Sequence, residues 1–173
     1  MEHFKAVIIG SGQGGNPLTT LLASKGWKTA LIEKKYVGGT CINYGCTPTK
    51  TMVASAQVAY LTLRAQDYGV QTENVNVDME AIRQRKRDIV TNFRKGNVSR
   101  IEDSDAELIR GSARFSGVKQ ISVALNDGGI RELSADYVFI DTGGHPNIPD
   151  IPGLEQIEYL NSTTIMELGE LPR

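Results

Sequence analysis

A glycine-rich turn between an apolar strand and a helix constrains the fold of this chain most. The run Gly10-Ser11-Gly12-Gln13-Gly14-Gly15 follows the apolar segment 4–9 and precedes a predicted helix over 17–25, which Gly26 would end. A continuous apolar run is typical of a strand buried on both faces of a parallel sheet. A tight glycine turn leading directly into a helix is typical of a βαβ unit. The sequence therefore predicts that the chain opens with a parallel crossover.

The same turn predicts a dinucleotide site. Gly10, Gly12 and Gly15 match the pattern G-x-G-x-x-G, which lets the backbone approach a pyrophosphate at the start of a helix. Glu33 closes a second predicted strand, 28–33, about 20 residues further on, where a carboxylate can accept hydrogen bonds from ribose hydroxyls. The alternative is a glycine-rich turn with a surface glutamate, which the strand and helix around the motif disfavour. These residues alone do not distinguish FAD from NAD.

The rest of the chain changes from helical to strand-like patterns. The turn sequence Asn126-Asp127-Gly128-Gly129 separates two predicted strands, and no internal repeat interrupts the order. We expect an α/β fold: a Rossmann-like parallel sheet with a dinucleotide-binding crossover and an inserted antiparallel β-meander. The further predicted elements are helices over 47–67, 78–101 and 163–168, and strands over 107–115, 120–125, 130–133 and 137–140.

The composition excludes several classes of function. The 173 residues carry a net charge of −1, so no global field favours nucleic acid or an anionic membrane. No apolar run approaches the ~18 residues of a spanning helix, and the N-terminus lacks the layout of a secretory signal. We therefore expect a cytoplasmic protein without membrane or nucleic-acid partners. The basic residues of 78–101 are interpreted as a solvated helix face: Arg83, Arg85, Lys86, Arg87, Arg94, Lys95 and Arg100.

The only two cysteines, Cys41 and Cys46, are separated by four residues in the segment 38–50. A structural disulfide is one interpretation, but it is uncommon in the cytosol. A closed metal site would need more ligands than two cysteines without a nearby histidine, so no metal site is predicted. A redox pair is favoured, because Cys46 precedes a predicted helix start where the dipole stabilises a thiolate, and Lys50 adds positive charge.

The segment 38–50 resembles the active-site signature of the class I pyridine nucleotide-disulfide oxidoreductases. This family includes mercuric reductase, dihydrolipoamide dehydrogenase and glutathione reductase. The resemblance extends over the whole chain and includes the glycine turn, Glu33 and the segments Gly111-Ser112-Ala113-Arg114-Phe115, Thr142-Gly143 and Ile151-Pro152-Gly153.

The resemblance implies a cofactor and a role for each cysteine. Cys41 would be the thiol that attacks the substrate, Cys46 the thiol that lies against the flavin, and Lys50 a residue near the flavin N5. Electrons would pass from NAD(P)H through FAD to the disulfide, and then to a small-molecule disulfide or a metal ion. A mercuric-reductase-like enzyme is favoured, followed by dihydrolipoamide dehydrogenase. The residues implied to bind FAD are Gly10, Gly12, Gly14, Gly15, Glu33, Gly39, Thr40, Ala113, Thr142 and Gly143.

Several parts of the family pattern lie outside this sequence, including a second G-x-G-x-x-G and the C-terminal interface domain. We therefore expect a fragment that is inactive alone, with NAD(P)H binding and a homodimer only in a full-length enzyme. Residues 1–150 would be the first, incomplete part of an FAD-binding domain, and 151–173 a linker. Asp141 replaces a small residue common in relatives, and its carboxylate could weaken flavin binding. The alternative function is a non-catalytic nucleotide-binding or thiol redox-sensing module.

Overall fold

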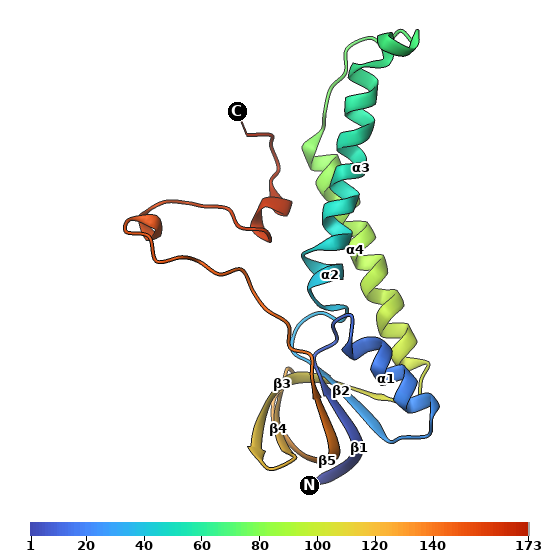
Figure 1. The fold of residues 1–173 in the computed structure, drawn as a ribbon, viewed down its shortest axis with the longest axis vertical. Coiled ribbons are helices and arrows are strands. Elements are labelled where there is room, and N and C mark those ends of the chain that lie inside the picture. Colours follow the sequence, from blue (N-terminus) through green and yellow to red (C-terminus); the bar gives the residue numbers. More distant parts are fainter. Residues whose placement is uncertain (173) are drawn as a thin grey trace. The chain divides into compact units, whose positions relative to one another are not determined.

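The computed structural model describes residues 1–172, and the chain divides into two compact units (Figure 1). The first unit combines Met1–Asn43 with Asn92–Gly144. The second combines Tyr44–Thr91 with the segment that begins at His145. The division differs from the predicted boundary at residue 150, which concerns a longer protein and stays a prediction.

The first unit is built on five strands that close into a barrel (Figure 1). Parallel pairs join β1 to β2, β1 to β5 and β2 to β3, and antiparallel pairs join β3 to β4 and β4 to β5. The predicted α/β class with a parallel sheet and an antiparallel meander is confirmed, but the closure into a barrel was not predicted. The strands are β1 (Glu2–Ile9), β2 (Thr29–Glu33), β3 (Glu107–Gly117), β4 (Gln120–Leu125) and β5 (Ile130–Ile140).

Strand β5 corrects the prediction of separate strands over 130–133 and 137–140. The polar residues between them suggested a break, but the ladder continues through Ala135, which is buried opposite Phe4. The first half of β5 pairs with β4 and most of the strand pairs with β1, so one long strand closes the barrel. The predicted turn between β4 and β5 is confirmed, with positive φ angles at Gly128 and Gly129.

Helix α1 (Gly15–Ser24) forms the predicted crossover from β1 to β2 and begins two residues before Pro17. Its Leu18 and Leu22 pack against the buried Ile8 and Leu31 of the sheet. Val98 and Ile101, near the end of α4 (Met79–Glu102), pack in the same cluster. A second apolar cluster, which includes Phe4, Ile32, Ile121 and Leu133, fills the barrel. The strands β1 and β2 thus contribute side chains to both packed cores.

The short helix α2 (Gly39–Asn43) was not predicted. Its five residues begin at a glycine and are too few to show a helical period. It belongs to the first unit and follows β2 closely.

The second unit contains α3 (Cys46–Leu63) and the N-terminal part of α4. The predicted start of α3 beside Cys46 is confirmed, but the helix ends at Leu63, before the predicted residue 67. A 3-10 turn, Ala65–Tyr68, follows and ends at Gly69 with φ 74°. Further 3-10 turns follow at Leu154–Gln156 and Thr164–Glu167, the second within the predicted helix 163–168. In residues 1–172, no helix has both the length and the apolarity needed to span a membrane.

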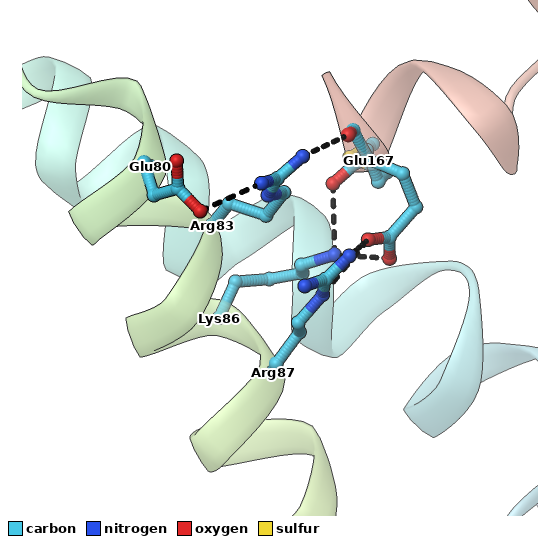
Figure 2. A network of polar contacts seen from close by, with 6 residues as sticks. Glu80, Arg83, Lys86, Arg87 and Glu167 are labelled. Atoms are coloured by element: carbon cyan, nitrogen blue, oxygen red, sulfur yellow. Dashed lines mark hydrogen bonds and ion pairs between the residues drawn. The ribbon is translucent and has the colours of Figure 1, made fainter. Parts of the chain in front are cut away.

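The basic stretch of α4 is not simply a solvated face, which corrects the sequence interpretation. Lys86 is only 2% exposed, and its Nζ donates to the carbonyl oxygen of Met166 at 2.8 Å and to the carboxylate of Glu167. Arg83 and Arg87 also hydrogen-bond to Glu167 (Figure 2). These basic side chains therefore bind the segment that follows the barrel within the second unit. The sequence did not reveal this, because Glu167 lies about 80 residues away.

Candidate nucleotide-binding site

The glycine turn is packed too tightly for side chains. Gly10 has φ 102°, and a Cβ built on it would lie 2.2 Å from the carbonyl oxygen of Asp141. A Cβ on Gly15 would lie 2.2 Å from the carbonyl oxygen of Gly10. Both distances are far inside van der Waals contact, so only glycine is compatible with this backbone. The turn therefore presents bare backbone between the end of β1 and the start of α1.

Glu33 lies at the end of β2, beside this turn. Its Oε2 accepts hydrogen bonds from the backbone N–H of Ser11 at 3.1 Å and from Ser11 Oγ at 2.6 Å. Its Oε1 accepts from the backbone N–H of Lys35 at 2.8 Å. The carboxylate is thus fixed in orientation, half-buried, and retains lone pairs for further donors.

The first residues of the cysteine signature pack directly on the glycine turn. A Cβ on Gly39 would lie 2.6 Å from the Cα of Gly12. The N–H of Gly38 is 3.1 Å from both the carbonyl oxygen and the hydroxyl of Ser11, and Gln13 Nε2 donates to the Gly38 carbonyl at 3.3 Å. The structure thus brings together Gly12 and Gly39, which the sequence analysis connected only by resemblance.

Asn43 and Arg94 support α2, and the sequence analysis missed this role. Asn43 Nδ2 donates to the carbonyl of Gly39 at 2.8 Å, and its Oδ1 accepts from Arg94 Nε. The guanidinium of Arg94 also lies 3.8 Å from the ring centroid of Tyr36, a cation–π contact. No local pattern could have revealed this pair, because the two side chains are 51 residues apart.

Asp141, which directly follows β5, caps helix α1. Its Oδ2 accepts a hydrogen bond from the N–H of Gly15 at 2.7 Å, across 126 residues of sequence. The same oxygen lies 2.7 Å from the position of a Cβ on Gly12. A carboxylate is favourable at the positive end of a helix dipole. The negative charge of Asp141 therefore sits over the glycine turn at the place where a bound anion is expected.

The other residues implied to bind the cofactor are placed differently. The backbone nitrogen of Thr142 lies 3.2 Å from the position of a Cβ on Gly10, so Thr142 adjoins the turn. Gly143 follows it, exposed and with φ 67°. Gly14 is the N-terminal flanking residue of α1. Ala113 pairs with Val123 of β4 and packs against the barrel core, so the structure does not group it with the turn.

The thiols are divided between the two units. In the first unit, Thr40 is exposed and Cys41 is half-buried, both in α2. In the second unit, Cys46 is an exposed free thiol at the first position of α3, and Lys50 is exposed one turn later. A cysteine at the first position of an 18-residue helix faces unsatisfied backbone N–H groups.

Comparison with known proteins identifies the family. The profile of the pyridine nucleotide-disulphide oxidoreductase family matches residues 4–173. The chain belongs to this family, as the glycine turn and the cysteine signature predicted.

The relatives include several enzymes. The chain is 35% identical to a mercuric reductase of Streptomyces lividans over 98% of its length, and 33% identical to a dihydrolipoyl dehydrogenase of Chlorobaculum tepidum over 99%. A solved structure, the Cu(II) complex of the HOCl-induced flavoprotein disulfide reductase RclA from Escherichia coli, matches with a TM-score of 0.84 and 35% identity over 99% of this chain. The chain spans only 36% of the length of each of these three proteins.

Proposed function

We propose that this chain is the FAD-binding, redox-active-disulfide portion of a flavoprotein oxidoreductase. Electrons would pass from NAD(P)H through FAD to a Cys41–Cys46 disulfide and then to substrate. The observation that carries the proposal is the contact of the cysteine signature with the glycine turn, where Gly39 abuts the Cα of Gly12. A nucleotide held at the turn would lie next to the segment that carries the thiols.

The residues at the turn suit the adenine half of a dinucleotide in most respects. Backbone N–H groups at the start of α1 would hold the pyrophosphate, and Glu33 would accept hydrogen bonds from the ribose. Asn16, in the first turn of α1, has a buried Oδ1 without a partner among residues 1–172, which leaves an acceptor for a donor from water or ligand. The carboxylate of Asp141 is the one feature that opposes an anion here.

The two cysteines have different roles in this proposal. Bound FAD would supply the two-electron relay between the nicotinamide and the disulfide. Reduction of the Cys41–Cys46 disulfide consumes two electrons and two protons and yields two thiols. The Cys41 sulfur would then attack the substrate, and Cys46, at the first position of α3, would stay on the flavin side with Lys50 one turn further on.

The relatives define the substrate classes to consider. We favour a mercuric-reductase-like activity, with a dihydrolipoamide-dehydrogenase-like activity as the next choice, on the names of the similar proteins. Because the similar protein RclA forms a Cu(II) complex, Cu²⁺ is also tested as a substrate. The nicotinamide site and the homodimer belong to the full-length protein in this proposal, and its location would be the cytoplasm.

The assignment of the thiols is tested by absorption spectroscopy of the reduced protein with FAD. We expect a long-wavelength charge-transfer band in the wild type and in Cys41→Ser, because both retain the Cys46 thiolate. The band should disappear in Cys46→Ser, which serves as the matched variant. Loss of the band in Cys41→Ser with its retention in Cys46→Ser would reverse the two roles.

A thiol redox-sensing module is the second candidate. The observation that favours it is that both cysteines lie within one short segment, 41–46. It predicts a reversible Cys41–Cys46 disulfide and no NAD(P)H consumption by the full-length protein with Hg²⁺, Cu²⁺, lipoamide or oxidised glutathione. Turnover with any one of these substrates would exclude this candidate and identify the substrate class.

A further inference from the structure

We infer that Asp141 sets the affinity of the glycine turn for its dinucleotide, because its carboxylate acts as an internal anion that a pyrophosphate must displace. The inference rests on the proposed function in taking a dinucleotide as the ligand of the turn. It assigns a new role, that of an affinity-determining residue, to a side chain beside the proposed site.

The hydrogen bond at Gly15 is the first observation. A phosphate bound at the start of α1 needs the free N–H groups of the first helical turn. The N–H of Gly15 is one of these groups, and it already donates to Asp141 Oδ2 at 2.7 Å. The carboxylate also covers the turn, since Oδ1 lies 3.5 Å from the position of a Cβ on Gly14 and Oδ2 lies 2.7 Å from that on Gly12.

Among residues 1–172, Asp141 is the only carboxylate that accepts from the start of α1, whereas Glu33 accepts from Ser11, earlier in the turn. The helix has no side-chain N-cap hydrogen bond from its own flanking residue and no acidic residue in its first turn. None of the ion pairs among residues 1–172 includes Asp141, so no basic side chain neutralises it. The charge of Asp141 is therefore balanced by the helix terminus alone, and this is the same positive end that would attract a phosphate.

The backbone of Asp141 is fixed, so only its side chain can move. Its N–H donates to the carbonyl of Ile9 at 2.8 Å, and its carbonyl oxygen lies against Gly10. A phosphate that accepts from Gly15 must turn the carboxylate away or be held beside a like charge. Either route costs binding free energy, because like charges at short range repel strongly where water is excluded.

The test measures binding by the whole chain, by calorimetry, with ADP, FAD and adenosine as probes. Asp141→Asn keeps an acceptor for the Gly15 N–H and removes the charge, whereas Asp141→Ala removes both. Asp127→Asn is the charge control, because it lies in the β4–β5 turn, at the other end of the eleven-residue strand β5. We expect both Asp141 variants to bind ADP and FAD about tenfold more tightly than the wild type. Asp127→Asn should match the wild type, and adenosine, which has no phosphate, should bind all four proteins equally.

Each other outcome overturns the inference in a recognisable way. Equal ADP affinity in wild type and both Asp141 variants would make Asp141 only a helix cap and leave the proposed function intact. Weaker ADP binding by Asp141→Asn would mean that the carboxylate increases the affinity for ADP. If none of the four proteins binds ADP or FAD, the inference fails for this chain, and FAD binding by the full-length protein then decides separately whether the proposed function also fails. Because Asp141→Asn retains the cap, it keeps the test valid if Asp141→Ala does not fold.

Discussion

The Cα of Gly15 and the carbonyl oxygen of Gly10 leave no room between them for a methyl group. We expect Gly15→Ala to destabilise the protein by about 2 kcal/mol or more, because a Cβ would lie 2.2 Å from the Gly10 oxygen and the backbone must shift. The same shift would misplace the N–H groups of the turn and abolish ADP binding. Urea denaturation and calorimetry measure the two effects.

Gly96→Ala is the matched control for this substitution. Gly96 lies within α4 in the same unit, and a Cβ on it would meet nothing within 4 Å. Alanine is the better helix former, so the variant should be more stable by about 0.5 to 1 kcal/mol and bind ADP like the wild type. Equal losses of stability in both variants would mean that the close contact at Gly15 does not cause the destabilisation.

Asp141 illustrates what a sequence can and cannot reveal about single side chains. Its identity marks it as unusual beside Thr142-Gly143, and its position after a buried strand places it near the expected cofactor. The hydrogen bond to Gly15 could not be predicted, because it depends on the pairing of β5 with β1, which brings Asp141 and Gly10 together. The hydrogen bonds that Glu33 accepts from Ser11 were not predicted either, because the sequence pattern assigned its carboxylate only to a ribose.

Helix α4 carries a buried cation whose partner lies in a 3-10 turn of the same unit. Burial raises the pKa of Glu167, but hydrogen bonds from Lys86 and Arg87 lower it more, so the net shift is downward. The side chain of Lys86 is 3% exposed and that of Glu167 is 50% exposed, so water screens part of the attraction (Figure 2). The network therefore stabilises the unit mainly by giving the buried ammonium group of Lys86 hydrogen-bond acceptors.

Replacing Glu167 should destabilise the protein more than replacing the buried Lys86. We expect Glu167→Gln to cost about 1 to 2 kcal/mol at neutral pH, because Lys86 stays buried without a counter-charge. Lys86→Met fills the same space with an apolar side chain and should cost less than 1 kcal/mol. Thermal unfolding of both variants checks the order, and a larger loss in Lys86→Met would contradict it.

The same network predicts a pH dependence. A carboxylate with a lowered native pKa stabilises the folded state above its ordinary value of 4.5, and this contribution is lost as pH falls through the native pKa. The difference in unfolding free energy between wild type and Glu167→Gln should therefore be full at neutral pH and shrink progressively below about pH 4.5. A difference that stays constant on acidification would assign the effect to packing instead of charge.

The elements differ in how well the sequence predicts them. Strand β4 has the predicted bounds, because the turn after it marks its end. Helix α3 begins within one residue of its predicted start, because a proline marks its first turn. Helix α2 was missed since five residues carry no period. The break predicted in β5 was wrong, because the ladder with β1 and not the local composition decides where a strand continues.

The closure of the barrel depends on contacts that no local pattern contains. Arg131, near the start of β5, donates to Glu107 at 2.6 Å and to Glu2 at 2.5 Å, and so joins β5 to β3 and β1. Hydrogen bonds from Arg131 and Lys28 lower the pKa of Glu2. Apart from the false break in β5, the sequence predicted the strands and the parallel crossover from β1 to β2, but it could not predict that the last strand returns to the first.

Both apolar clusters lie in the first unit, so we expect damage to the second unit to leave the first unit unchanged. The first unit is stabilised by the barrel cluster and the cluster under α1. The largest fully buried side chains, such as Phe4, Ile101 and Leu133, all belong to it. We therefore expect the slowest amide exchange in the barrel strands and faster exchange in residues 145–172, which have few buried side chains.

Hydrogen exchange of two variants tests this independence. Glu167→Gln should raise exchange in residues 79–91 and 145–172 and leave the barrel strands unchanged, because its partners all lie in the second unit. Gly15→Ala should raise exchange in β1, α1 and the end of β5 and leave α3 unchanged, because its clash is with Gly10. If either variant instead raises exchange uniformly along the chain, the two units unfold together. For Glu167→Gln, this result would mean that the Lys86–Glu167 network also contributes to the stability of the barrel.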